Sequence, residues 1–94
     1  MRLDKQEEKA VFEAISGIPG EVFLFGSRVD DSKKGGDIDL LIFSKEKSFH
    51  LSRKISTRFF MNCEEKIDVI VMDPDNLSLE QQAFLNIINK VKIK

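Results

Sequence analysis

The sequence predicts a two-layer α+β fold (α/β two-layer), in which helices pack on one face of a small β-sheet. Two observations support this prediction. Short apolar runs typical of strands alternate along the chain with stretches whose apolar residues recur at helical spacing. The length of 94 residues also suits one hydrophobic core and is too short for two, so we expect a single domain over residues 1–94.

Charge and composition exclude several classes of protein. The chain has 15 Lys and Arg against 16 Asp and Glu, which does not support a generally basic nucleic-acid-binding protein. No apolar run is long enough for a transmembrane helix, and the first residues lack the apolar centre of a signal peptide. The single cysteine, Cys63, excludes an internal disulfide and a Cys-rich zinc site, so we expect a reduced, cytoplasmic protein.

The first half of the chain predicts one helix and two strands. Asp4 and Glu7 have the spacing of a capping box, so a helix begins there and ends at the Gly/Pro-rich segment that follows. Residues 21–25 and 37–43 are apolar runs that predict strands, and the polar segment between them predicts a loop or a short helix within a loop. The expected apolar stripe of the helix consists of Val11, Phe12, Ala14 and Ile15.

The second half predicts a helix, a strand and a final helix. A helix over about residues 48–62 has Leu51, Ile55 and Phe59 on its core face, and a strand over residues 66–72 follows. Ser78 and Gln81 predict the cap of the last helix. The expected stripe of that helix consists of Phe84, Ile87, Ile88 and Val91.

Two aspartates, Asp37 and Asp39, stand at the start of the second predicted strand. Because side chains alternate along a strand, both carboxylates leave the same face, while Ile38 and Leu40 point into the core. Two like charges this close repel each other, and a divalent cation with oxygen ligands is a common compensation. The alternative is that these aspartates are solvated at the strand end or cap the turn before them.

The third predicted strand carries one further acidic residue, Asp68. If this strand lies beside the second, Asp68 faces the same side as Asp37 and Asp39. Three carboxylates on two neighbouring strands would form a two-metal site for phosphoryl or nucleotidyl transfer. Considered alone, Asp68 is equally explained as an aspartate on an edge strand or at a strand start.

The tripeptide Gly26-Ser27-Arg28 directly follows the first predicted strand. Backbone N–H groups and the Ser27 hydroxyl at such a turn can hold phosphate oxygens, and Arg28 could add a charge-assisted contact. Considered alone, a Gly-Ser pair is an ordinary turn. The Gly-rich patterns of Rossmann and Walker-type nucleotide sites are absent from the sequence.

In combination, these features resemble the DNA polymerase β-like nucleotidyltransferase superfamily. Its pattern is a Gly-Ser after a strand, an Asp-h-Asp strand after a short spacer, where h is apolar, and a third carboxylate on a later strand. Gly26, Ser27, Asp37, Asp39 and Asp68 match this pattern, and the resemblance covers nearly the whole chain. In size the chain is similar to the minimal nucleotidyltransferases (MNT proteins), which include MntA-type antitoxins of HEPN/MNT toxin–antitoxin modules.

The resemblance implies a polymerase β-like nucleotidyltransferase fold with a mixed sheet, and a function as a transferase. Asp37 and Asp39 would bind two Mg²⁺ ions, and Asp68 would bind the catalytic metal and help deprotonate the acceptor. Gly26 and Ser27 would hold the β- and γ-phosphates of ATP. AMP would pass to a hydroxyl acceptor, which in related antitoxins is a tyrosine of the cognate HEPN-domain toxin.

The resemblance also implies that a partner subunit completes the site, because larger relatives carry a second helical domain, so we expect a homo- or hetero-oligomer. The chain has Gly35-Gly36 before Asp37, where many relatives have Gly-x-Ser, and we expect this difference to alter the loop. Two other functions remain open: an antitoxin that neutralises a HEPN partner by complex formation without catalysis, and a metal-dependent nuclease. The Gly-Ser turn argues against the nuclease.

Two groups of basic residues have no assigned role in this scheme. Lys33 and Lys34 lie between the two halves of the motif and either screen phosphate charge or are ordinary loop lysines. Residues 45–58 contain five basic residues and one acidic residue, with His50, Lys54 and Arg58 on one helical face. This face either meets an acidic partner or a polynucleotide, or is simply solvated.

Overall fold

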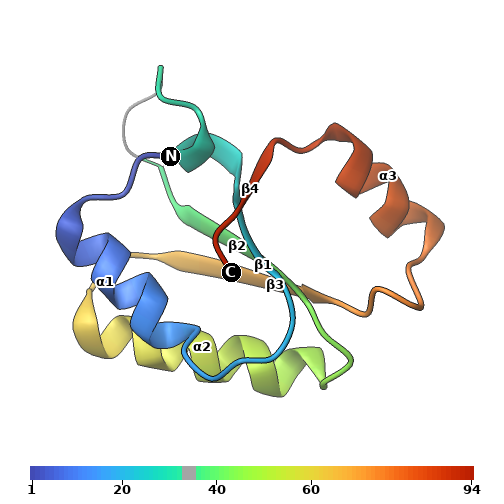
Figure 1. Cartoon of the computed structure of the whole chain (residues 1–94), viewed down its shortest axis with the longest axis horizontal. Coiled ribbons are helices and arrows are strands. Elements are labelled where there is room, and N and C mark those ends of the chain that lie inside the picture. The colour runs from blue at the N-terminus through green and yellow to red at the C-terminus, as the bar shows by residue number, and fades with distance from the viewer. Residues whose placement is uncertain (33–35) are drawn as a thin grey trace.

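A mixed sheet of four strands forms the centre of the computed structural model, which describes residues 1–32 and 36–94 (Figure 1). The strands lie in the order β3-β2-β1-β4. The pairs β1–β2 and β1–β4 are antiparallel, and the pair β2–β3 is parallel. The strand bounds are β1 (Val22–Phe25), β2 (Ile38–Phe43), β3 (Ile67–Met72) and β4 (Lys90–Lys92).

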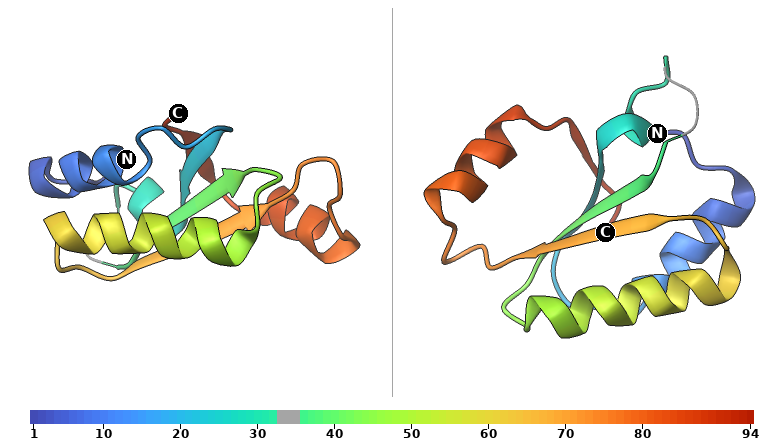
Figure 2. Two further views of the ribbon diagram at one scale, coloured as in Figure 1. Left: turned by 90° about the horizontal axis from the view of Figure 1, so that it is seen from below. Right: turned by 180° about the vertical axis from the view of Figure 1, so that it is seen from behind.

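Two of the three α-helices cover one face of this sheet, which confirms the predicted two-layer α+β fold. They are α1 (Lys5–Ala14) and α2 (Ser48–Asn62), and α2 forms the crossover between the parallel strands β2 and β3. The third, α3 (Leu79–Ile87), lies at the opposite end of the molecule from α1 (Figure 2). No helix within the described ranges combines the length and the apolar character needed to span a bilayer.

The main core lies between the sheet and the helices α1 and α2. Alternate strand residues point into it, as the strand periodicity predicts. The predicted core face of α2, Leu51, Ile55 and Phe59, is buried there and is confirmed. The strands contribute Val22, Leu24, Ile38, Leu40 and Ile42.

The opposite face of the sheet is only partly covered, by α3. Phe84 packs edge-on against Phe25, with ring centroids 5.6 Å apart. None of the residues of α3 is fully buried, and Leu79 and Ile87 are about four-fifths exposed, at 83% and 80%. A second, smaller core on this face nevertheless buries Phe25, Leu41 and Met72.

Both predicted capping boxes are confirmed, Asp4 with Glu7 in α1 and Ser78 with Gln81 in α3. Two parts of the predicted apolar stripes are wrong. Phe12 is 41% exposed, because the buried face of α1 is narrower than the run of apolar residues.

The last helix is also shorter than its apolar spacing predicts. It ends at Ile87, and the following residue is extended. Val91 is opposite Leu24 in β4 and does not continue the helix. Ile87 and Val91 have helical spacing only by coincidence. The edge strand β4 begins at Lys90, soon after the helix ends at Ile87.

Candidate active site

A row of paired residues crosses the sheet at one end of the strands. Asp68 of β3 is opposite Asp39 of β2, and Asp39 is opposite Phe25 of β1. Residues paired across neighbouring strands point to the same face and lie about 5 Å apart. Because Ile38 and Leu40 are in the core between the sheet and α2, both carboxylates lie on the opposite face. The structure therefore brings Asp39 and Asp68 together, the arrangement on which the predicted site depends.

Asp37 lies directly before β2 and belongs to the same acidic group. Its Oδ2 atom is 3.5 Å from Nζ of Lys66, the residue that precedes β3. Partial burial first, and then the negative charges of Asp68 and Asp37, raise the pKa of Asp39 above its usual value. Three carboxylates thus lie close enough to repel one another, with Lys66 as a neighbouring cation.

The Gly-Ser turn packs directly against this acidic group. Gly26 has a φ of +79°, and a Cβ atom there would lie 2.5 Å from Oδ2 of Asp39. Gly36 has a φ of +90°, and a Cβ atom there would collide with Oγ of Ser27. The two glycines therefore allow the turn, the Asp39 carboxylate and the start of β2 to approach closely. The turn is a short 3₁₀ helix, η1 (Gly26–Val29), so the predicted loop does contain a short helix.

Arg28 of this turn has partners within the protein. Its guanidinium donates to both carboxylate oxygens of Glu7, at 2.8 and 2.9 Å, and to the carbonyl oxygen of Gly36 at 3.0 Å. Only 12% of its side chain is exposed. A contact between Arg28 and a substrate phosphate stays a prediction. Lys33 and Lys34, the other candidate phosphate ligands, lie outside the described residues.

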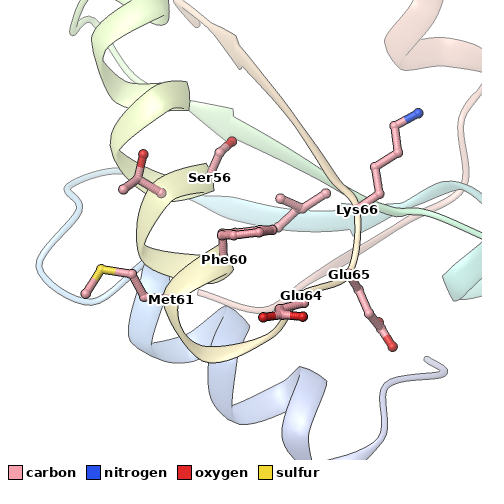
Figure 3. Close-up of a pocket in the computed structure, with 8 residues that line it drawn as sticks. Ser56, Phe60, Met61, Glu64, Glu65 and Lys66 are labelled. Atoms are coloured by element: carbon pink, nitrogen blue, oxygen red, sulfur yellow. The ribbon is translucent and has the colours of Figure 1, made fainter.

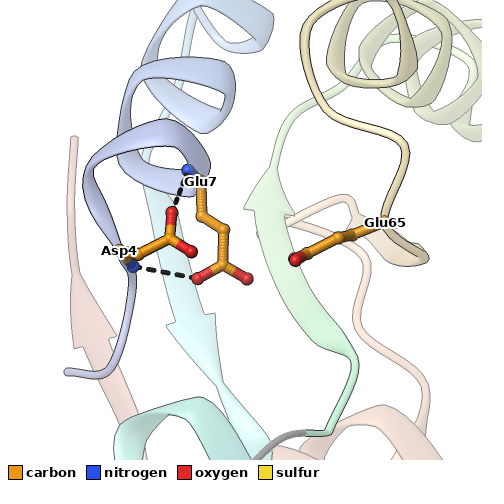
Figure 4. A group of neighbouring side chains, drawn as sticks. All are labelled: Asp4, Glu7 and Glu65. Atoms are coloured by element: carbon orange, nitrogen blue, oxygen red, sulfur yellow. Dashed lines mark hydrogen bonds between the residues drawn. The ribbon is translucent and has the colours of Figure 1, made fainter.

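A second acidic group lies on the other side of Arg28 and consists of Asp4, Glu7 and Glu65 (Figure 4). One oxygen from each lies within 4.8 Å of the others, which is tighter than the group around Asp39 in the described part of the chain. The Asp4 and Glu7 carboxylates accept the reciprocal hydrogen bonds of the α1 capping box, and Glu7 also binds Arg28. Because these bonds account for the arrangement, we assign this group a role in holding α1.

Sequence reasoning missed the Glu7–Arg28 ion pair. It explained Glu7 fully as part of a capping box, and its second partner is 21 residues further along the chain. The sequence held a weak signal, since an arginine follows a turn directly and an acidic residue stands in an otherwise amphipathic helix. That signal does not specify a pair.

A pocket of about 600 Å³ lies beside the site, between the end of α2 and the start of β3 (Figure 3). Phe60 and Met61 line it, and both are largely exposed. Lys66 lies at its rim, and its side chain extends away from the other labelled residues (Figure 3). None of the three aspartates lines this pocket; Asp37 and Asp68 are exposed, and Asp39 is half-buried.

Comparison with known families gives a match over more than half of the chain. Residues 17–90 match the family described as "Polymerase beta, Nucleotidyltransferase". The chain belongs to this family. The matched segment contains the Gly-Ser turn, all three aspartates and all four strands except the last two residues of β4. A comparison with curated proteins found no match.

Members of this nucleotidyltransferase family typically use divalent metal ions, and the donor atoms present here suit Mg²⁺. Carboxylate oxygens are the ligands that hard divalent cations prefer. The mutual repulsion around Asp39 is of the kind that a cation relieves, and Gly26 leaves the space beside its Oδ2 atom free of a side chain. The residues of this site therefore fit a metal centre.

Proposed function

We propose that this protein is a Mg²⁺-dependent nucleotidyltransferase that transfers AMP from ATP to a hydroxyl group. The observation that supports this most strongly is the pairing of Asp39 with Asp68, with Gly26 packed against the Asp39 carboxylate. Two bound Mg²⁺ ions would supply positive charge next to the reacting phosphate. Asp37, Asp39 and Asp68 would hold them.

The remaining roles are those that the resemblance to this family implies. Ser27 and the backbone of the turn hold the β- and γ-phosphates, beside the carboxylate group. The acceptor hydroxyl oxygen attacks the α-phosphorus and forms the new P–O bond, while the bond to the pyrophosphate oxygen breaks. The Asp68 carboxylate takes the hydroxyl proton. Most of the rate enhancement in such reactions comes from positioning and electrostatics.

We further propose that the acceptor is a tyrosine of a HEPN-domain toxin and that this protein acts as its antitoxin by AMPylation. The basis is the resemblance to minimal nucleotidyltransferases. The exposure of the site supports a macromolecular acceptor, because the side chain of Asp37 is 46% exposed and Asp68 is also exposed. The alternative is an antitoxin that neutralises its partner by complex formation alone.

Labelled ATP tests the proposed reaction. With Mg²⁺ and a HEPN partner, we expect label from the α-phosphate, and none from the γ-phosphate, to appear on the partner, with release of pyrophosphate. Asp68→Asn should reduce this transfer at least about 100-fold, because it removes a metal ligand and the proton acceptor. The matched control is Asp75→Asn, the same substitution at an exposed aspartate paired with Lys45 at the other end of β3.

The labelled-ATP experiment also separates nucleotidyl transfer from the two alternative functions, binding without catalysis and nucleic-acid cleavage. If Asp68→Asn abolishes transfer but still neutralises the toxin as well as the wild type, binding alone accounts for the antitoxin function. If ATP stays intact while nucleic acid is cleaved with Mg²⁺, the protein is a nuclease and the proposed transfer is wrong.

A further inference from the structure

We propose that Arg28, oriented by Glu7, is a positioning residue that fixes the Gly26–Ser27 turn relative to the aspartates of β2 and β3. This inference rests on the proposed function, since it assigns the turn to phosphate binding. The contacts that support the inference all lie within the protein, and one of the two measurements that test it is made without substrate.

The pair between Glu7 and Arg28 is shielded from water. The side chains are 5% and 12% exposed, and both carboxylate oxygens of Glu7 accept from the guanidinium. Burial raises the pKa of Glu7, but hydrogen bonds from Arg28 and neighbouring groups outweigh it and lower the pKa to about 2. Such a bidentate pair fixes the orientation of the guanidinium plane as well as its position.

The fixed guanidinium then reaches the start of β2. Arg28 Nε donates to the carbonyl oxygen of Gly36, which is the residue before Asp37 and packs on the Ser27 side chain. One side chain of the turn is thus bonded to the segment that carries the acidic pair. A shift of Arg28 would change the distance between the turn and the carboxylates.

The same guanidinium also approaches the segment that carries the third aspartate. Arg28 Nη2 lies 3.7 Å from Glu65, three residues before Asp68. Glu7 from α1 and Glu65 from the segment between α2 and β3 point toward one another (Figure 4). Arg28 therefore lies between α1, the start of β2 and the approach to β3.

The N-terminal segment holds the other side of the turn. The backbone N–H of Arg2 donates to the carbonyl oxygen of Arg28 at 2.7 Å, and the Arg2 guanidinium donates to the carbonyl oxygen of Ser27 at 2.8 Å. Arg28 Nη1 returns a bond to the carbonyl oxygen of Arg2 at 2.9 Å. With both sides bonded, the turn has little freedom to move away from Asp39. This matters because a misplacement of about 1 Å can reduce a rate by about 100-fold.

Two substitutions test the proposal, each with a matched control. Arg28→Lys keeps the charge but loses the planar fork that serves Glu7 and Gly36 together. Its control is Arg58→Lys, since Arg58 also donates to backbone carbonyls, those of Ala14 and Ser16, but far from the aspartates. Glu7→Gln removes the orienting charge, and its control is Glu8→Gln, an exposed residue of the same helical turn.

The first measurement uses the metal-free protein. Glu7 makes no direct bond to Gly36 or Asp37, and Arg28 links them because it bonds both to Glu7 and to the carbonyl oxygen of Gly36. We expect Glu7→Gln to shift the amide resonances of Gly36 and Asp37 in ¹⁵N spectra, and Glu8→Gln to leave them unchanged. Unchanged resonances in Glu7→Gln would overturn the inference, whatever reaction the protein catalyses.

The second measurement is kinetic and is made well below the unfolding temperature of each variant. We expect Arg28→Lys to lower kcat/KM for ATP at least about 10-fold, while Arg58→Lys lowers stability and leaves kcat/KM near the wild-type value. Equal kinetic constants for the two lysine variants would also overturn the inference. If the wild type transfers no AMP while Glu7→Gln still shows the resonance shifts, the proposed function alone is disproved.

Discussion

At the scale of single residues, the stability of the folded chain and the proposed metal binding make opposite demands on the charge of Asp39. It is half-buried and opposite Asp68, and burial followed by the charges of Asp68 and Asp37 raises its pKa. A raised pKa means that the folded protein disfavours the ionised carboxyl relative to the unfolded chain. At neutral pH without metal, Asp39 therefore lowers the free energy of unfolding.

We expect Asp39→Asn to make the metal-free protein more stable at pH 7, by up to about 1 kcal/mol, the scale of partly exposed charge interactions. The gain should disappear as the pH falls through the raised pKa of Asp39, because the wild-type carboxyl is then neutral too. The same variant should lose the increase in Tm that Mg²⁺ gives the wild type. Denaturant unfolding measures the difference in stability, and thermal unfolding with and without Mg²⁺ measures the change in Tm. A variant less stable than the wild type without metal would contradict the argument.

The candidate site residues could be predicted because the pattern that indicates them lies within short segments of the sequence. Asp37 and Asp39 stand out as charges in a predicted strand, and the period of two places them on the face away from Ile38. The partnership of Asp39 with Asp68 needed one more assumption, that β2 and β3 are neighbours, and the pairing in the structure confirms it. The sequence predicts a phosphate contact for Arg28 from its charge alone, while its position depends on Glu7 in another element.

At the scale of elements, the turn between β1 and β2 depends on its glycines. Gly26 combines a φ of +79° with a place directly against the Asp39 carboxylate. Gly17, after α1, has a nearly equal φ of +76° but has no atom within 4 Å of the place where a Cβ would be. The two positions therefore separate backbone strain from close approach.

We expect Gly17→Ala to cost about 1–2 kcal/mol of stability from the left-handed conformation alone, and to leave nucleotidyl transfer unchanged. Gly26→Ala should cost more, because the added methyl group displaces Asp39, and it should reduce transfer about 100-fold or more. Thermal unfolding and the labelled-ATP assay measure the two effects. Equal losses in the two variants would show that Gly26 serves the turn and not the site.

The helices and the first three strands could be predicted because each has a local signature. The reciprocal capping pairs gave the starts of α1 and α3, and the spacing of Leu51, Ile55 and Phe59 gave the buried face of α2. The strand β4 has no such signature. Its three residues, Lys90–Lys92, are exposed and mostly charged, and they form a strand only because β1 offers a free edge. Pairing at an edge depends on the partner strand and not on the segment itself.

At the scale of the whole molecule, one buried charge pair links α1 to the Gly26–Ser27 turn and the start of β2, in addition to the apolar packing of α1 in the core. Glu7 from α1 binds Arg28, which in turn bonds to the start of β2. The family match begins at residue 17, after α1, so this contact and the core packing of α1 both join the first helix to the matched part of the chain. Contacts of this range leave no trace in local periodicity, which explains why the fold was predictable and this link was not.

The Glu7–Arg28 pair should also govern how the whole molecule responds to acid. Hydrogen bonds from Arg28 and neighbouring groups overcome the effect of burial and lower the pKa of Glu7 from 4.5 to about 2. A depressed carboxyl pKa adds stability that is fully present above the pKa of the unfolded chain and is lost as the pH falls toward the pKa of the folded protein.

We expect Glu7→Gln to lower the free energy of unfolding by about 2–4 kcal/mol at pH 7. This difference should shrink steadily between about pH 5 and pH 2, as denaturant unfolding of both proteins across that range would measure. Glu8→Gln in the same helical turn provides the baseline, and a difference between wild type and Glu7→Gln that stays constant down to pH 2 would show that Glu7 acts through packing and not through its charge.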